Sequence, residues 1–205
     1  MDRSSHVSGV STFDRILWDE PPAIACAYPT RNGSGVVLHA RSPQSGSADI
    51  PKSADLVMLV MRDALHRYDE ASVRGLPVDR GFARGRFTLI PPGCASRWAS
   101  GGHPALLHIQ LTPDRLAPLD ELAVGPLTYG LRVNAHDPAI DRIALQLASE
   151  LAAPGPFTEL AVDTLLLGLA LHVLRPDLNC KQLQPVDATR LPHWRMARVL
   201  DCIDG

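Results

Sequence analysis

The sequence predicts an α+β fold, in which a strand-rich part is followed by two helices. Up to about residue 135, short apolar runs alternate with clusters of Gly, Pro, Ser and Asp, a pattern typical of strands joined by tight turns. From residue 136 on, apolar residues recur at helical spacing, which indicates helices. The regular spacing of the short strands favours a small barrel or sandwich for the first part.

The clearest strand is the continuous apolar run Asp55–Arg62. One strand ends at the turn Pro91-Pro92-Gly93, where proline restricts φ and glycine allows a positive φ. We expect a short helix at Thr12–Trp18 and further strands at Gly35–Ala40, Arg86–Ile90, Ser96–Ala99, Ala105–Leu111 and Tyr129–Val133.

Two helices are expected over residues 136–176, and they would form a helical hairpin. Asp137 suits the N-cap of the first helix, and Pro138 suits its first turn. Residues 153–156 (Ala-Pro-Gly-Pro) end that helix. The second helix runs from about Thr158 to Leu174, where Arg175-Pro176 is expected to end it.

The second helix is apolar nearly all round, whereas a helix on the outside of a domain needs only one apolar stripe. Two buried faces are therefore expected, one against the domain and one against a second subunit. We predict a homodimer; the alternative is a helix fully buried in its own domain. The candidate interface residues are Leu160, Asp163, Leu166, Leu167 and Leu174.

Composition excludes several classes of protein. The net charge of −2 argues against a DNA-binding surface within these residues. No apolar run reaches 18 residues, and the polar N-terminus leads into no apolar segment, so we expect neither a membrane span nor a secretion signal but a cytoplasmic protein. The four cysteines show no Cys-x-x-Cys spacing and are expected to be free thiols: Cys26, Cys94, Cys180 and Cys202.

No catalytic or metal-binding motif is apparent. The strand-rich part contains His39, His66, His103 and His108 but no His-x-His pair. Convergence of three imidazoles in space without that spacing stays open. No Ser/His/Asp or Cys/His arrangement is visible either, so we predict no enzyme activity, no metal and no cofactor.

A small-molecule effector pocket is predicted from the alternation along residues 106–111. Leu106, His108 and Gln110 lie on one strand face, which is either exposed to solvent or lines a cavity. Arg97 would suit an anionic effector; the alternative is an arginine on the surface. Trp98 is either a pocket residue or part of the core. The candidate pocket residues are His66, Arg97, Trp98, His108 and Gln110.

Residues 191–203, with the pattern Leu-x-x-Trp-Arg-x-x-Arg-Val-Leu-Asp-x-Ile, resemble the start of the DNA-binding domain of AraC-type transcription regulators. Gly-Arg-Phe-Thr-Leu-Ile-Pro-Pro-Gly at residues 85–93, followed by Ser96-Arg97-Trp98, is similar to part of the cupin-like sensor barrel of such regulators. The resemblance implies four parts: a cupin-like effector-sensing barrel at 1–135, a dimerising helical hairpin at 136–176, a linker at 177–190, and at 191–205 the first helix of a helix-turn-helix domain.

The same resemblance implies that the chain stops inside this first helix and lacks the helices that read DNA. We therefore predict the sensing and dimerisation region of an AraC-type regulator, which would contact DNA only through a further domain. Two alternatives remain. One is a stand-alone cupin-like, metal-dependent enzyme, and the other is a truncated ligand-binding protein that sequesters full-length partners.

Overall fold

The strands of the molecule form two facing antiparallel sheets and a short hairpin. The computed structural model describes residues 13–31, 33–122 and 129–182. The smaller sheet has the order β1 (Leu17–Trp18), β4 (Gly46–Ile50), β11 (Ser96–Ser100), β7 (Glu70–Val73), β8 (Leu76–Pro77). The larger sheet has the order β13 (Arg132–His136), β10 (Arg86–Ile90), β5 (Leu56–Met61), β12 (Leu106–Leu111), β3 (Gly35–His39), β2 (Ile24–Pro29). The hairpin pairs β6 (Leu65–Arg67) with β9 (Gly81–Ala83).

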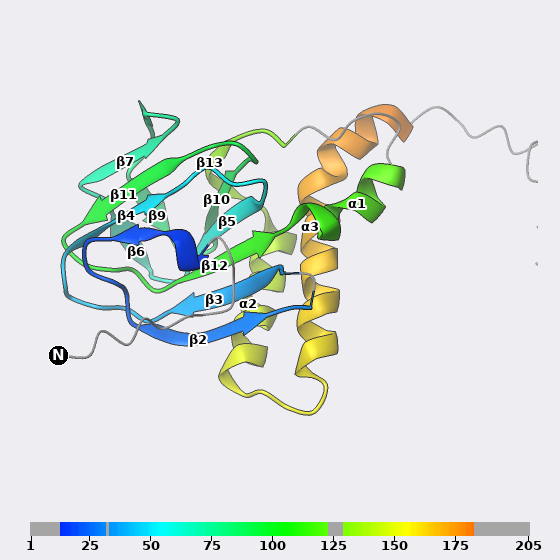
Figure 1. Cartoon of the computed structure of the whole chain (residues 1–205), viewed down its shortest axis with the longest axis horizontal. Helices are drawn as coiled ribbons and strands as arrows, with labels where there is room; N and C mark the ends of the chain where they lie inside the picture. The colour runs from blue at the N-terminus through cyan, green and yellow to red at the C-terminus, as the bar shows by residue number, and fades with distance from the viewer. Residues whose placement is uncertain (1–12, 32, 123–128, 183–205) are drawn as a thin grey trace, which may run out of the picture.

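The α-helices cover the outer face of the larger sheet, and a short 3-10 helix lies on its other side. They are the short 3-10 helix η1 (Phe13–Arg15) and the α-helices α1 (Pro113–Leu122), α2 (Pro138–Ala152) and α3 (Thr158–Gln182). Figure 1 shows α2 and α3 running side by side along one side of the sheets, with η1 on the other side of the larger sheet. The molecule therefore has three layers: the smaller sheet, the larger sheet, and the α-helices.

Two hydrophobic clusters hold these layers together. The first lies between the sheets and includes Val37, Ile50 and Trp98. The second lies between the larger sheet and the helices and includes Met58, Leu107 and Leu166. Because both faces of β5 are covered, this strand is apolar along its whole length, as expected for a strand buried on two sides.

Local signals in the sequence are confirmed at two places. The Asp137 carboxylate accepts hydrogen bonds from the backbone N–H groups of Ala139 (2.8 Å) and Ile140 (3.4 Å), which caps α2. Gly93 has φ of +76° in the turn after β10, a conformation that costs little only for glycine.

The predicted fold class is wrong. The strands do not close into a cupin-like barrel but form two sheets with separate edges. The two predicted helices are not an appended hairpin, because their buried residues share one hydrophobic cluster with β5, β10 and β12. The predicted helix-turn-helix segment, residues 191–205, lies outside the described residues. The strand-rich character of the N-terminal part agrees with the prediction.

Two helices also differ from expectation: α1 was not predicted, and α3 is longer than predicted. Helix α1 was not expected, since its segment contains Pro118 and has only weak amphipathic periodicity. Helix α3 continues past Pro176 to Gln182, so the linker expected at 177–190 begins as helix; its remainder, from residue 183, lies outside the described residues. None of the described helices is both long enough and apolar enough to cross a membrane.

Candidate functional site

A cavity lies between the two sheets, near the end where β3, β12 and β4 meet the N-terminal segment. The cavity has a volume of about 40 Å³, measured as the space that the centres of water molecules can reach. One water needs about 10–15 Å³ by this measure, so the cavity has room for only a few waters. The lining is mostly apolar and aromatic: Ile16, Trp18, Gly46, Ala48, Ile50, Leu59, Tyr68, Trp98, Pro104 and Leu106, together with Ser100 and three histidines. The cavity thus accepts a small group, or the end of a larger molecule.

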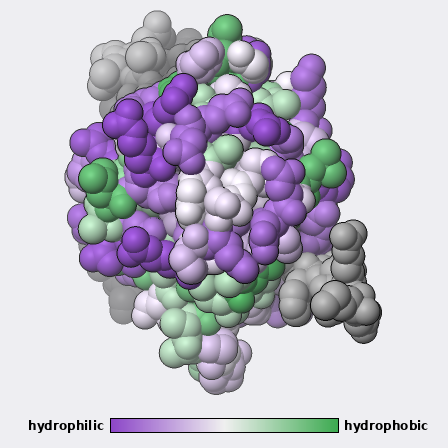
Figure 2. Space-filling view, turned by 90° about the vertical axis from the view of Figure 1, so that its left-hand side faces the viewer, coloured by the Kyte–Doolittle hydropathy of each residue, from purple (hydrophilic) through white to green (hydrophobic). Residues whose placement is uncertain are grey.

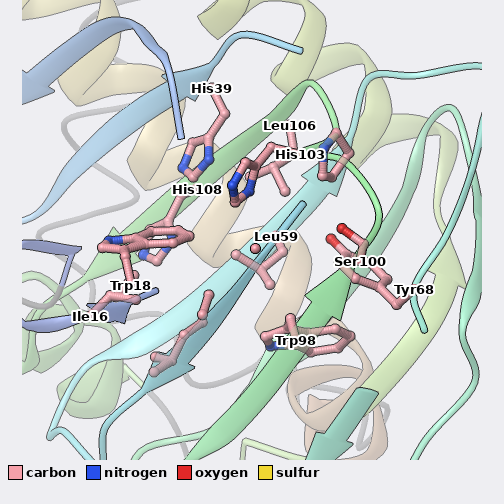
Figure 3. Close-up of a pocket in the computed structure, with 14 residues that line it drawn as sticks. Ile16, Trp18, His39, Leu59, Tyr68, Trp98, Ser100, His103, Leu106 and His108 are labelled. Atoms are coloured by element: carbon pink, nitrogen blue, oxygen red, sulfur yellow. The ribbon is translucent and has the colours of Figure 1, made fainter. Parts of the chain in front are cut away.

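The three histidines that line the cavity come from neighbouring parts of the larger sheet. Antiparallel pairing places His39 of β3 opposite Leu106, two residues before His108 on β12. Both imidazoles therefore face the smaller sheet, and their rings lie parallel with centroids 6.3 Å apart. His103 precedes β12 and is held by a β-bridge with Ser42. Figure 3 shows the histidines and Trp18 on one side of the cavity, facing Trp98, Tyr68 and Ser100.

Aromatic side chains from the N-terminal segment cover the histidines. The Phe13 ring meets both His39 and His108 edge-on, at centroid distances of 5.3 Å. The Trp18 ring lies 5.9 Å from His39 and 6.1 Å from His103. These contacts fix the imidazole planes by aromatic packing rather than by a network of hydrogen bonds.

Burial keeps these histidines uncharged. Desolvation lowers the pKa of His108 to about 3. The pKa of His39 is lowered well below its usual range, mainly by desolvation and further by its neighbours His108 and His103. Desolvation also lowers the pKa of His103, although nearby Glu20 opposes the shift. No Asp, Glu, Lys or Arg lines the cavity, so the described lining is electrically neutral near pH 7.

The Nε2 atoms of His39, His103 and His108 are buried and have no hydrogen-bond partner among the residues that the structure describes. A buried polar atom without a partner costs about 1–3 kcal/mol. In contrast, the indole N–H of Trp98 is satisfied by a 3.0 Å hydrogen bond to the Ser96 hydroxyl. The unsatisfied imidazole nitrogens are therefore positions where a bound molecule gains hydrogen bonds.

The five predicted pocket residues lie in four different places. Trp98 and His108 line the cavity. His66 instead lines an open groove on the surface, which His103 also borders. Arg97 lies on the opposite face of β11 from Trp98 and forms ion pairs with Asp49 (2.8 Å) and Glu70 (3.4 Å).

Gln110, the fifth candidate, is fully buried on β12. Its side-chain amide donates to the Asp55 carboxylate at 3.0 Å, and it is not among the residues that line the cavity. The strand alternation placed Gln110 on the same face as His108, but Gln110 lies near the other end of β12, where it faces Asp55.

Sequence reasoning missed His39, His103, Trp18 and Tyr68 as cavity residues. A signal existed for His39, because it has the same strand parity as Val37 and so faces inward. No comparable signal marks His103, which lies outside a regular strand. Within the part of the chain that the structure describes, no group of three His, Cys, Asp or Glu side chains is placed to hold a metal ion.

The residues predicted for a dimer interface lie on different faces of α3. Leu166 and Leu174 are buried within the domain. Asp163 forms an ion pair with Arg115 of α1 at 2.9 Å. Leu160 and Leu167 are exposed, and so is Leu171. The side of the molecule farthest from the α-helices is mostly hydrophilic (Figure 2).

Comparison with known proteins shows only weak similarities. No family model and no curated protein matches the chain. Among solved structures, the AraC-like transcriptional activator CuxR is similar over 82% of this chain and 64% of that chain, at 12% identity and a TM-score of 0.42. The chain thus spans less than two thirds of that activator's length.

Two family 35 carbohydrate-binding modules are also similar, over about half of this chain. The module from Paenibacillus barcinonensis matches 47% of this chain and 98% of its own, at 13% identity and a TM-score of 0.24. The module from Clostridium thermocellum matches 48% of this chain and 92% of its own, at 14% identity and a TM-score of 0.27. At these scores none of the likenesses carries an argument about function.

Proposed function

We propose that the chain is the effector-binding and dimerisation region of a cytoplasmic transcription regulator of the AraC type, and that the cavity between the sheets is the effector site. The observation that supports effector binding is the neutral cavity with three buried imidazoles whose Nε2 atoms have no partner among the described residues. The motif at residues 191–203 supports the assignment to a regulator. The chain binds its effector and does not transform it.

The cavity suits a small uncharged group, such as the edge of a planar ring that belongs to a larger molecule. The aromatic rings of Trp18, Trp98 and Tyr68 provide apolar faces, and stacking on such faces is favourable beyond simple burial. The histidine Nε2 atoms offer hydrogen bonds at the edge of the cavity. A charged group placed between the sheets would lose its hydration without an opposite charge to replace it.

Ligand binding to the purified chain tests the effector site. Thermal unfolding is followed with nicotinamide, indole-3-carboxamide and phenol as uncharged planar probes, and also with nicotinate, indole-3-carboxylate and phenyl phosphate. A saturable rise in Tm with at least one probe is expected, and Leu59→Phe, which fills the cavity, should abolish it. The exposed-site variant Leu65→Gln should retain the rise. If none of the six compounds shifts Tm, the assignment of the cavity as an effector site is overturned.

Dimerisation is proposed to use the outer face of α3. Leu160, Thr164, Leu167 and Leu171 lie at spacings of four, three and four residues, which place them on one face, and all four are exposed. Sedimentation velocity at micromolar concentration is expected to show a dimer that Leu160→Glu with Leu167→Glu converts to a monomer. The matched control is Leu65→Glu with Leu76→Glu, which changes two exposed leucines on β6 and β8. A monomeric wild-type protein would refute this part of the proposal.

A further inference from the structure

The cavity and the surface groove share one side chain, His103. This residue is only 7% exposed. Its ring packs so closely on β4 that a Cβ added at Gly46 would lie 2.8 Å from its Nε2 atom. The imidazole thus forms a thin wall between the neutral interior and the groove outside.

The groove differs from the cavity in size and in charge. It has about 720 Å³ of room, against about 40 Å³ in the cavity. Its charged lining residues are Arg41, Arg67 and Asp69, so two cations face one carboxylate. Both arginines are exposed, and neither forms an ion pair with another residue in the described ranges.

His66 also lines the groove. Its Nε2 atom is buried and has no hydrogen-bond partner within the described parts of the chain. Burial lowers the pKa of His66, with nearby Asp63 opposing the shift and Arg41 adding to it. The groove therefore presents two guanidinium groups beside the wall of the cavity.

We infer that the effector carries one anionic group, a carboxylate or a phosphate, which lies in the groove between Arg41 and Arg67 while the edge of its uncharged planar part reaches into the cavity beside His103. This inference rests on the proposed function and names the class of its ligand. Guanidinium groups pair with carboxylates and phosphates through two parallel hydrogen bonds, which the neutral cavity does not offer. The arginines of the groove thus bind the anionic group of the effector, and the apolar lining of the cavity selects for the shape of its uncharged part.

Matched pairs of probes test the inference by isothermal titration at pH 7: nicotinate with nicotinamide, indole-3-carboxylate with indole-3-carboxamide, and phenyl phosphate with phenol. In at least one pair the anion should bind about tenfold tighter than its neutral partner, the gain expected of a charge-assisted pair. Tighter binding of nicotinate or indole-3-carboxylate would indicate a carboxylate effector, and tighter binding of phenyl phosphate would indicate a phosphate. Arg41→Gln with Arg67→Gln should reduce the ratio to about one without weakening the neutral probe.

The matched control is Arg31→Gln with Arg86→Gln, which removes two exposed arginines that do not line the groove and should leave the ratio unchanged. Neutral probes that bind as tightly as their anions in every pair would overturn the inference and leave the effector site intact. If the control variant lowers the ratio of anion to neutral affinity as much as the groove variant does, the inference is also overturned. The net positive charge of any two arginines would then explain why anions bind more tightly. Failure of all six probes would overturn the inference together with the proposed function.

Discussion

Lowering the pH from 7 to 5 should destabilise the folded protein through its buried histidines. In the unfolded chain a histidine has a pKa of about 6.5, whereas burial lowers the pKa of His108 in the folded protein to about 3. The unfolded chain therefore binds more protons between these two values. The contribution of His108 to stability is present above pH 6.5 and is lost as the pH falls below that value.

The size of the effect follows from proton linkage. One proton of difference between the unfolded and folded states changes the free energy of unfolding by about 1.4 kcal/mol per pH unit. Between pH 7 and pH 5, His108 alone should therefore remove about 2 kcal/mol of stability. The lowered pKa values of His39 and His103 act in the same direction, so the loss for the whole protein should be larger.

Urea unfolding at pH 7, 6 and 5, followed by circular dichroism, measures this loss. The variant His108→Gln keeps a polar side chain that does not titrate, so its stability should fall by about 2 kcal/mol less than that of the wild type between pH 7 and 5. His136→Gln is the control, because His136 is exposed on β13. A His108→Gln protein with the same pH dependence as the wild type would refute the buried, neutral state of this imidazole.

Three further predictions concern packing, and each is measured by urea unfolding at a fixed protein concentration. Gly46→Ala should cost about 1–3 kcal/mol, because its Cβ would lie 2.8 Å from the His103 ring, whereas Gly155→Ala meets no atom within 4 Å; equal costs would contradict the close packing of His103. Leu166→Ala should cost about 2–5 kcal/mol because Leu166 is fully buried under the sheet, and a cost below that range would place this face of α3 outside the core. Asp137→Ala should cost about 1 kcal/mol through loss of the cap on α2; an unchanged stability would show that the two hydrogen bonds to the carboxylate contribute nothing.

The sequence predicted local features better than their assembly. The helix start at Asp137 and the turn at Gly93 were legible, because a cap or a positive φ depends on a few neighbouring residues. The end of the last helix at Arg175-Pro176 was predicted wrongly, since α3 continues through Pro176 to Gln182. Proline lowers the chance that a helix continues, but it does not by itself fix where a helix ends.

The candidate site was only partly predictable for a related reason. Alternation along residues 106–111 indicated that His108 and Leu106 share a strand face, and that face lines the cavity. The same rule gave no means of distinguishing Gln110, which faces Asp55, from His108. Arg97 and Trp98 are adjacent in sequence, yet one forms surface ion pairs and the other lines the cavity, because successive side chains of a strand point to opposite faces.

The sequence by itself determined the strands near residues 35–40, 55–62, 86–90, 96–99 and 105–111, the start of α2, and which side chains share a strand face. These features depend on residues a few positions apart. Only the tertiary structure decided that the strands form two sheets, that the helices share a core with the larger one, and that His39, His103 and His108 meet at one cavity. Those outcomes depend on pairings between strands far apart in the chain, such as β3 with β12. Such pairings are selected by the burial of whole faces, which residue spacing alone does not encode.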